Sequence, residues 1–184
     1  MTGKSIGLVE LSSVAAGYLA ADTMLKAGEV ELLLARSICS GKYMVLVGGE
    51  LGAVEAAVRA GIESADGCLI AELVLPNVHA EVIGALGPSS LGRGGGPALG
   101  ILESFHVATL IQAADAAAKA AAVSLREIRL AMALGGKAFV TMTGDVGAVE
   151  AAISAGREVL AQGGVLVHAV VIPRPHPDLD REIV

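Results

Sequence analysis

The sequence predicts an α+β protein made of two tandem domains, each with the β-α-β-β-α-β order of the ferredoxin-like, or split βαβ, arrangement. Three observations lead to this prediction: the chain repeats itself, both copies show the same series of strand and helix patterns, and a glycine-rich segment separates them. The predicted first domain covers residues 1–87, the linker covers residues 88–97, and the second domain covers residues 98–184.

The repeat is visible as matching segments at nearly constant spacing. The segment IGLVE at residues 6–10 returns 93 positions later as LGILE at residues 99–103. The segment GAVEAA at residues 52–57 returns unchanged 95 positions later, and His79 returns as His176 after 97 positions. The chain is therefore a tandem duplication with two small insertions, and the first insertion falls in the turn near Cys39.

Each element is predicted from hydrophobic periodicity in the first copy. Alternating apolar residues predict strands at 5–11, 30–38, 42–48 and 68–75. Helical spacing predicts helices at 14–26 and 50–65. The first of these has an apolar face that recurs in the second copy. The face consists of Val14, Tyr18, Ala21 and Leu25, which are matched by Val107, Ile111, Ala114 and Ala118. We expect an antiparallel middle hairpin and both helices on one face of the sheet.

The glycine-rich segment GPSSLGRGGG at residues 87–96 is flexible by composition. Its glycines do not favour nucleotide binding, because the tract lies between domains and not in a turn from a strand to a helix. We therefore interpret it as a linker.

Composition and charge exclude several classes of partner. A net charge of −6 and only 2% aromatic residues argue against binding to nucleic acid. Mean hydropathy is high, at +0.68, but no apolar run approaches the length of about 20 residues that spans a membrane. The pattern of the first predicted strand starts directly after residues 1–4, so we expect no signal peptide and a cytoplasmic location. Much apolar surface is then expected to be buried between subunits.

The titratable residues do not form a catalytic or zinc-binding pattern. The four histidines have no HExxH or HxxxH spacing, and we interpret them as surface or turn residues. Glu10 and Glu103 are duplicated, and we expect each to end a strand or cap a helix. Cys68 opens a predicted strand and is interpreted as a small packing residue. The chain is therefore not expected to be an enzyme.

The segments IGLVEL, AADTMLKAG, SGKYMVLVGGELGAVEAAVRAG and VIPRPH together resemble the bacterial microcompartment shell domain. Two fused copies make the chain similar to the tandem-domain shell proteins, and among these to the members that carry an iron–sulfur cluster. Each copy begins with a strand, so the resemblance is to the non-permuted type. It covers nearly the whole chain outside the linker.

The resemblance implies a homotrimer that mimics a hexamer, with a pore on its axis, in a microcompartment shell within the cytoplasm. Such tiles pack edge to edge with other shell proteins, and encapsulated redox enzymes are possible further partners. Lys26, Lys119 and Arg174 match the edge contacts of the family, whereas the first copy has Asn77 where the second has Arg174. The simpler interpretation of the two lysines is an i,i+4 ion pair with Asp22 and with Asp115.

The resemblance also places two turns at the pore. The residues expected to line it are Ile38, Cys39, Ser40 and Gly41 in the first copy and Met132, Ala133, Leu134 and Gly135 in the second. One Cys39 cannot hold a metal cluster, but three around a threefold axis could ligate three irons of one [4Fe–4S] cluster per trimer. The second turn has no cysteine, so any such site is threefold.

Three alternatives to the cluster-bearing tile remain open. Cys39 could be a small residue in a metal-free pore that passes small metabolites. The chain could instead be a ligand-sensing trimer of ferredoxin-like domains, although its short turns and acidic charge argue against that. A nucleophilic Cys39 is disfavoured because only Arg36 and Lys42, and no histidine, lie nearby in the sequence.

Overall fold

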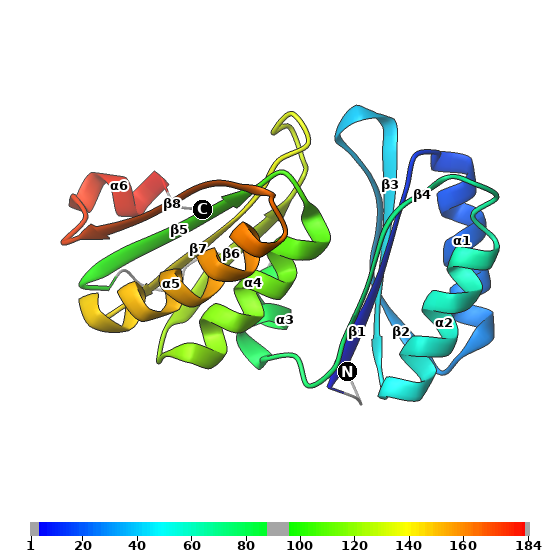
Figure 1. The fold of residues 1–184 in the computed structure, drawn as a ribbon, viewed down its shortest axis with the longest axis horizontal. Helices are drawn as coiled ribbons and strands as arrows, with labels where there is room; N and C mark the ends of the chain where they lie inside the picture. The colour runs from blue at the N-terminus through cyan, green and yellow to red at the C-terminus, as the bar shows by residue number, and fades with distance from the viewer. Residues whose placement is uncertain (1–3, 88–95, 183–184) are drawn as a thin grey trace. The chain divides into compact units, whose positions relative to one another are not determined.

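The chain folds as two compact units divided between Val78 and His79 in a computed structural model that describes residues 4–87 and 96–182. Each unit has a four-stranded antiparallel sheet with two long helices side by side on one face (Figure 1). The strand orders are β2-β3-β1-β4 and β6-β7-β5-β8, so the two sheets have the same topology. The predicted α+β fold with two β-α-β-β-α-β copies is confirmed.

The bounds of the elements follow the predicted order closely. The first unit contains β1 (Ser5–Leu11), α1 (Val14–Ala27), β2 (Val30–Ile38), the 3-10 turn η1 (Cys39–Gly41), β3 (Lys42–Gly49), α2 (Leu51–Glu63) and β4 (Leu69–Leu75). The second unit contains α3 (Ala80–Leu86), β5 (Ala98–Ser104), α4 (Val107–Ala120), β6 (Ser124–Leu130), β7 (Ala138–Gly144), α5 (Val146–Gln162), β8 (Leu166–Pro173) and α6 (Pro177–Glu182).

A glycine in the first strand of each sheet allows a helix to pack closely on it. A Cβ atom at Gly7 would lie 2.5 Å from Val58 of α2, and one at Gly100 would lie 2.7 Å from Val149 of α5. Because a side chain at either position would push the helix away, the duplicated glycine fixes the distance between helix and sheet. The core of each unit thus forms between the two long helices and those strand side chains that point toward them, which are every second residue along each strand.

The structure contains a further short helix at the end of the first repeat. Helix α3 was not predicted, and it groups with the second unit. The helix is only seven residues long, too short to show helical periodicity. Of the predicted linker, residues 88–95 lie outside the described residues.

The high mean hydropathy corresponds to apolar side chains left exposed on particular surfaces. Among the residues that the structure describes, no helix is long and apolar enough to cross a membrane. On α1, however, Tyr18 is 66% exposed, and Val14 and Leu25 are exposed as well. Their counterparts on α4, the residues at the same place in the second repeat, are all buried. The same apolar stripe is therefore covered in one repeat and open in the other.

Candidate functional site

The first candidate turn joins β2 to β3 and carries Cys39 at its start. The strands pair as far as Ile38 and Lys42, so residues 39–41 form the tip. Ser40 has φ 67° and ψ 29°, and Gly41 has φ 72°, which places two successive residues in the left-handed region. Glycine adopts this conformation freely, whereas serine there costs about 1–2 kcal/mol. Cys39 is half-buried and forms no disulfide.

The second candidate turn joins β6 to β7 and is longer. The pair of Ser37 with Tyr43 in the first hairpin corresponds to Leu130 with Ala138, the last pair of the second hairpin. The spacing between repeats grows from 93 to 95 positions across these pairs, so the second turn is two residues longer and the predicted insertion lies there. Its backbone has positive φ at Ala131, Ala133, Gly135 and Gly136, and Met132 is exposed. Both turns are at the predicted places in the chain; their position at a pore stays a prediction.

An ion pair lies at the base of each turn, and sequence reasoning missed both. Lys42 Nζ lies 2.9 Å from Glu10 Oε1, and Lys137 Nζ lies 2.5 Å from Glu103 Oε1. The side chain of Glu10 is 3% exposed and that of Glu103 is 30% exposed. Glu10 and Glu103 lie one residue before the ends of β1 and β5, close to the expected strand ends, and each is also an ion-pair partner. The duplicated Gly-Lys after each turn was the available signal.

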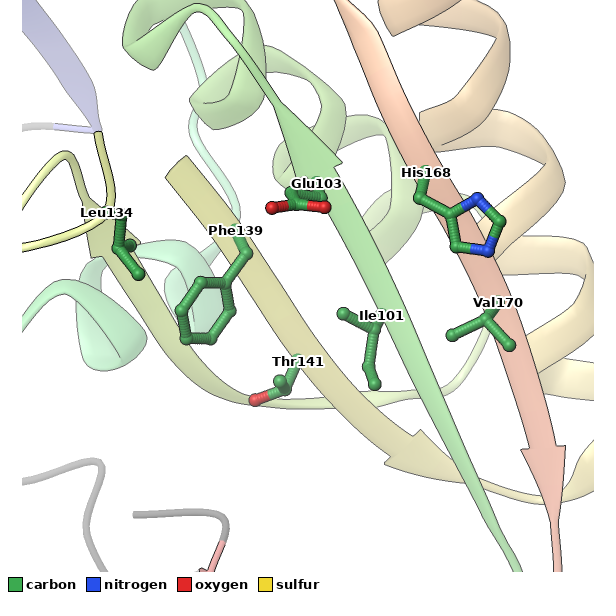
Figure 2. A pocket seen from close by; sticks show the side chains of 7 residues that line it. All are labelled: Ile101, Glu103, Leu134, Phe139, Thr141, His168 and Val170. Carbon is green, nitrogen blue, oxygen red and sulfur yellow. The ribbon is translucent and has the colours of Figure 1, made fainter. Parts of the chain in front are cut away.

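The sheet face away from the helices has a hollow in the second unit. The hollow has a volume of about 450 Å³ and is lined by Ile101, Glu103, Leu134, Phe139, Thr141, His168 and Val170. Figure 2 shows six of these side chains on three neighbouring strands and Leu134 on the second turn. We call this surface, which α4 and α5 leave uncovered, the helix-free face. On the first sheet the matching residues are buried: Leu8, Glu10, Met44, Leu46, Ala71 and Leu73.

Two arginines at the same place on the helix-free faces have different surroundings. Arg129 Nη2 lies 2.6 Å from Glu127 Oε1, and the guanidinium carbon Cζ of Arg129 lies 5.3 Å from the centre of the Phe139 ring. Burial lowers the pKa of its counterpart Arg36, whose Nε is buried without a hydrogen-bond partner. Thr141 Oγ1 is likewise buried and has no partner. The two faces therefore differ in polarity although their backbones match.

The three predicted edge residues lie at the ends of elements. Lys26 Nζ is 2.6 Å from Asp22 on α1, and Lys119 Nζ is 2.6 Å from Asp115 on α4. The i,i+4 interpretation of the two lysines therefore holds within one chain. Arg174 is exposed, has φ 50°, and donates from its backbone N to Pro97 O at 2.7 Å. The edge role of these residues stays a prediction.

The described residues of a single chain contain no group of three His, Cys, Asp or Glu side chains that could hold a metal ion. Three histidines have a different role: His79, His106 and His176 each accept a hydrogen bond at Nδ1 from a backbone N at the start of a helix. They cap α3, α4 and α6, while His168 lines the hollow. Any metal cluster at Cys39 would need more than one chain.

Comparisons with known proteins agree with this architecture. The BMC domain model matches residues 5–78 and again residues 98–175. The bacterial microcompartment shell protein PduT of Citrobacter freundii is 41% identical over 182 residues, with 98% of both chains covered. The major carboxysome shell protein CsoS1A of Halothiobacillus neapolitanus is 42% identical over 88 residues, which is 45% of this chain and 87% of that protein.

Solved structures give the same result. The crystal structure of a microcompartments protein from Desulfitobacterium hafniense DCB superposes with a TM-score of 0.91 at 49% identity, over 96% of this chain and 98% of that one. The fused permuted hexameric shell protein MSM0275 from the RMM microcompartment superposes with a TM-score of 0.63 at 23% identity, over 85% and 81% of the two chains. This second likeness concerns the fold alone.

Proposed function

Because the chain belongs to the BMC-domain family and is a microcompartment shell protein of the PduT type, not an enzyme, we propose that three copies form a ring-shaped tile with a [4Fe–4S] cluster in its pore. As a shell protein it is located in the microcompartment shell, where it assembles with other shell proteins. The tile would offer electrons a route across that shell.

The ring is supported by two surfaces that are open in one repeat and buried in the other. The apolar stripe of α1 is exposed in the first unit, and the helix-free face is open in the second unit. A head-to-tail contact between these two different surfaces on successive chains generates a closed ring if the rotation fits. With two repeats in each chain, three chains supply six similar positions around the axis.

The placement of Cys39 carries the proposal of the cluster. One thiol per chain, at the tip of the shorter turn, offers three thiolates to a threefold axis, which fits three corners of the cluster. A bound cluster would supply one-electron transfer. Ser40 and Gly41 fix the direction in which the chain leaves Cys39, while the second turn adds side chains without thiols, including Met132 and Leu134.

Iron and sulfide analysis of anaerobically purified protein tests this function. We expect a brown protein with about four irons and four labile sulfides per trimer, and a native mass of three chains plus one cluster. Cys39→Ser should remove all iron, whereas the matched control Cys68→Ser should keep it. An anaerobic wild-type trimer without iron and sulfide would contradict the cluster and leave a metal-free pore for small metabolites.

A further inference from the structure

The two short helices at the ends of the repeats have the same local design. Each starts with a histidine cap: His79 Nδ1 accepts from Glu81 N at 3.3 Å before α3, and His176 Nδ1 accepts from Asp178 N at 3.2 Å before α6. The two histidines are 97 positions apart, which is the spacing of the repeats at this point. Helix α6 is therefore the counterpart of α3.

Helix α3 is held against α4 and β6 by two hydrogen bonds and an apolar contact. His79 N donates to Asp115 Oδ1 at 2.8 Å, and Leu125 N donates to Glu81 Oε2 at 2.9 Å. Val82 is fully buried. Asp115 binds His79 N and Lys119 at the same time, so one carboxylate serves both the helix and the neighbouring lysine.

Helix α6 exposes the residue that corresponds to Val82. Leu179 is 40% exposed. The counterparts of the groups that hold α3 all lie in the first unit: Asp22 corresponds to Asp115, and Leu32 corresponds to Leu125. Asp22 is 57% exposed, and Leu32 is also exposed, although Leu125 is fully buried. The receiving surface and the helix are thus both present and both open.

We propose that α6 of one chain docks on α1 and β2 of the next chain, with the backbone N–H of His176 donating to Asp22 and Leu179 packing beside Leu32. The occupant is a second copy because the hydrogen-bonding groups are complementary: Asp22 supplies a charged acceptor and the start of α6 supplies the N–H donor. The proposal rests on the ring proposed above and names the contact that joins its chains.

Three features make this docking specific to α6. The acceptor on α1, Asp22, already forms an ion pair with Lys26, just as Asp115 does with Lys119. The apolar residues around it, Leu32 and Tyr18, correspond to residues that are fully buried in the second repeat. The carboxylate of Asp178 corresponds to that of Glu81, which places it to accept from the N–H of Leu32 in the neighbouring chain.

Dissociation of the trimer on dilution, followed by mass photometry, tests the docking. Asp22→Ala should raise the dissociation constant about tenfold or more, because it removes a charged hydrogen-bond acceptor. Asp22→Asn keeps an acceptor oxygen but loses the ion pair with Lys26, so it should have a smaller effect. Leu179→Asp should also raise the constant tenfold or more. Leu51→Asp is the control, since Leu51 is 39% exposed and lies on α2.

The outcomes separate this inference from the proposed function. If wild-type protein at micromolar concentration is a single chain, the ring is overturned and the docking with it. If the wild-type protein is trimeric and the Asp22 and Leu179 variants dissociate like Leu51→Asp, the docking is overturned and the ring stands. Thermal unfolding of each variant, measured at a dilution where wild type and variant are both single chains, should lie within about 0.5 kcal/mol of the wild type, because all three side chains are exposed. Hydrogen exchange at residue 176 should be slow in the trimer and faster in Asp22→Ala.

Discussion

The two repeats keep the same core and differ where the chain meets its surroundings. Gly7 and Gly100 admit a helix at the same point of each sheet, and the strand orders are identical. The turns after β2 and β6 differ in length and in the presence of a cysteine, and the ion pairs beneath them differ in burial. Duplication thus preserved the packing that folds each unit and let the two turns specialise.

The largest expected effect concerns the two ion pairs at the bases of the turns. Lys42→Met leaves the nearly buried Glu10 carboxylate without its partner, which should cost about 2–3 kcal/mol of unfolding free energy. Lys137→Met leaves Glu103 partly in water and should cost about 1 kcal/mol or less. Urea unfolding of the two variants measures both values. Equal losses would mean that burial does not distinguish the two turns.

The repeat order and the element order could be predicted because both follow from local patterns in the sequence. Alternating apolar residues predicted strands β1 through β8, and the change in the spacing between the repeats near Cys39 showed which turn differs in length. Helices α3 and α6 could not be predicted from the sequence because they have seven and six residues, too few to show helical periodicity. The partnership of Glu10 with Lys42 spans 32 positions and depends on strand pairing, which no local pattern shows.

A smaller effect is expected at Thr141, where the helix-free face of the first repeat has Leu46. The Thr141 hydroxyl is buried without a hydrogen-bond partner, and valine has nearly the same shape. Thr141→Val should therefore stabilise the protein by about 1 kcal/mol. Thermal unfolding at low protein concentration measures the change. A loss of stability would mean that the hydroxyl has a partner in solution, and that the two faces differ less than their side chains suggest.

The smallest effect separates the two lysines at the ends of α1 and α4. Both ion pairs measure 2.6 Å, but Asp22 is 57% exposed and Asp115 is 6% exposed. Lys26→Met should cost at most about 0.5 kcal/mol, and this cost should vanish in high salt because exposed charges are screened. Lys119→Met should cost about 1 kcal/mol and persist in salt, since the Asp115 carboxylate is buried and also holds His79. Urea unfolding at low and high salt distinguishes the two. If Lys119→Met lost as little stability as Lys26→Met and this loss also vanished in high salt, the attachment of α3 would contribute nothing to the ion pair of Lys119 with Asp115.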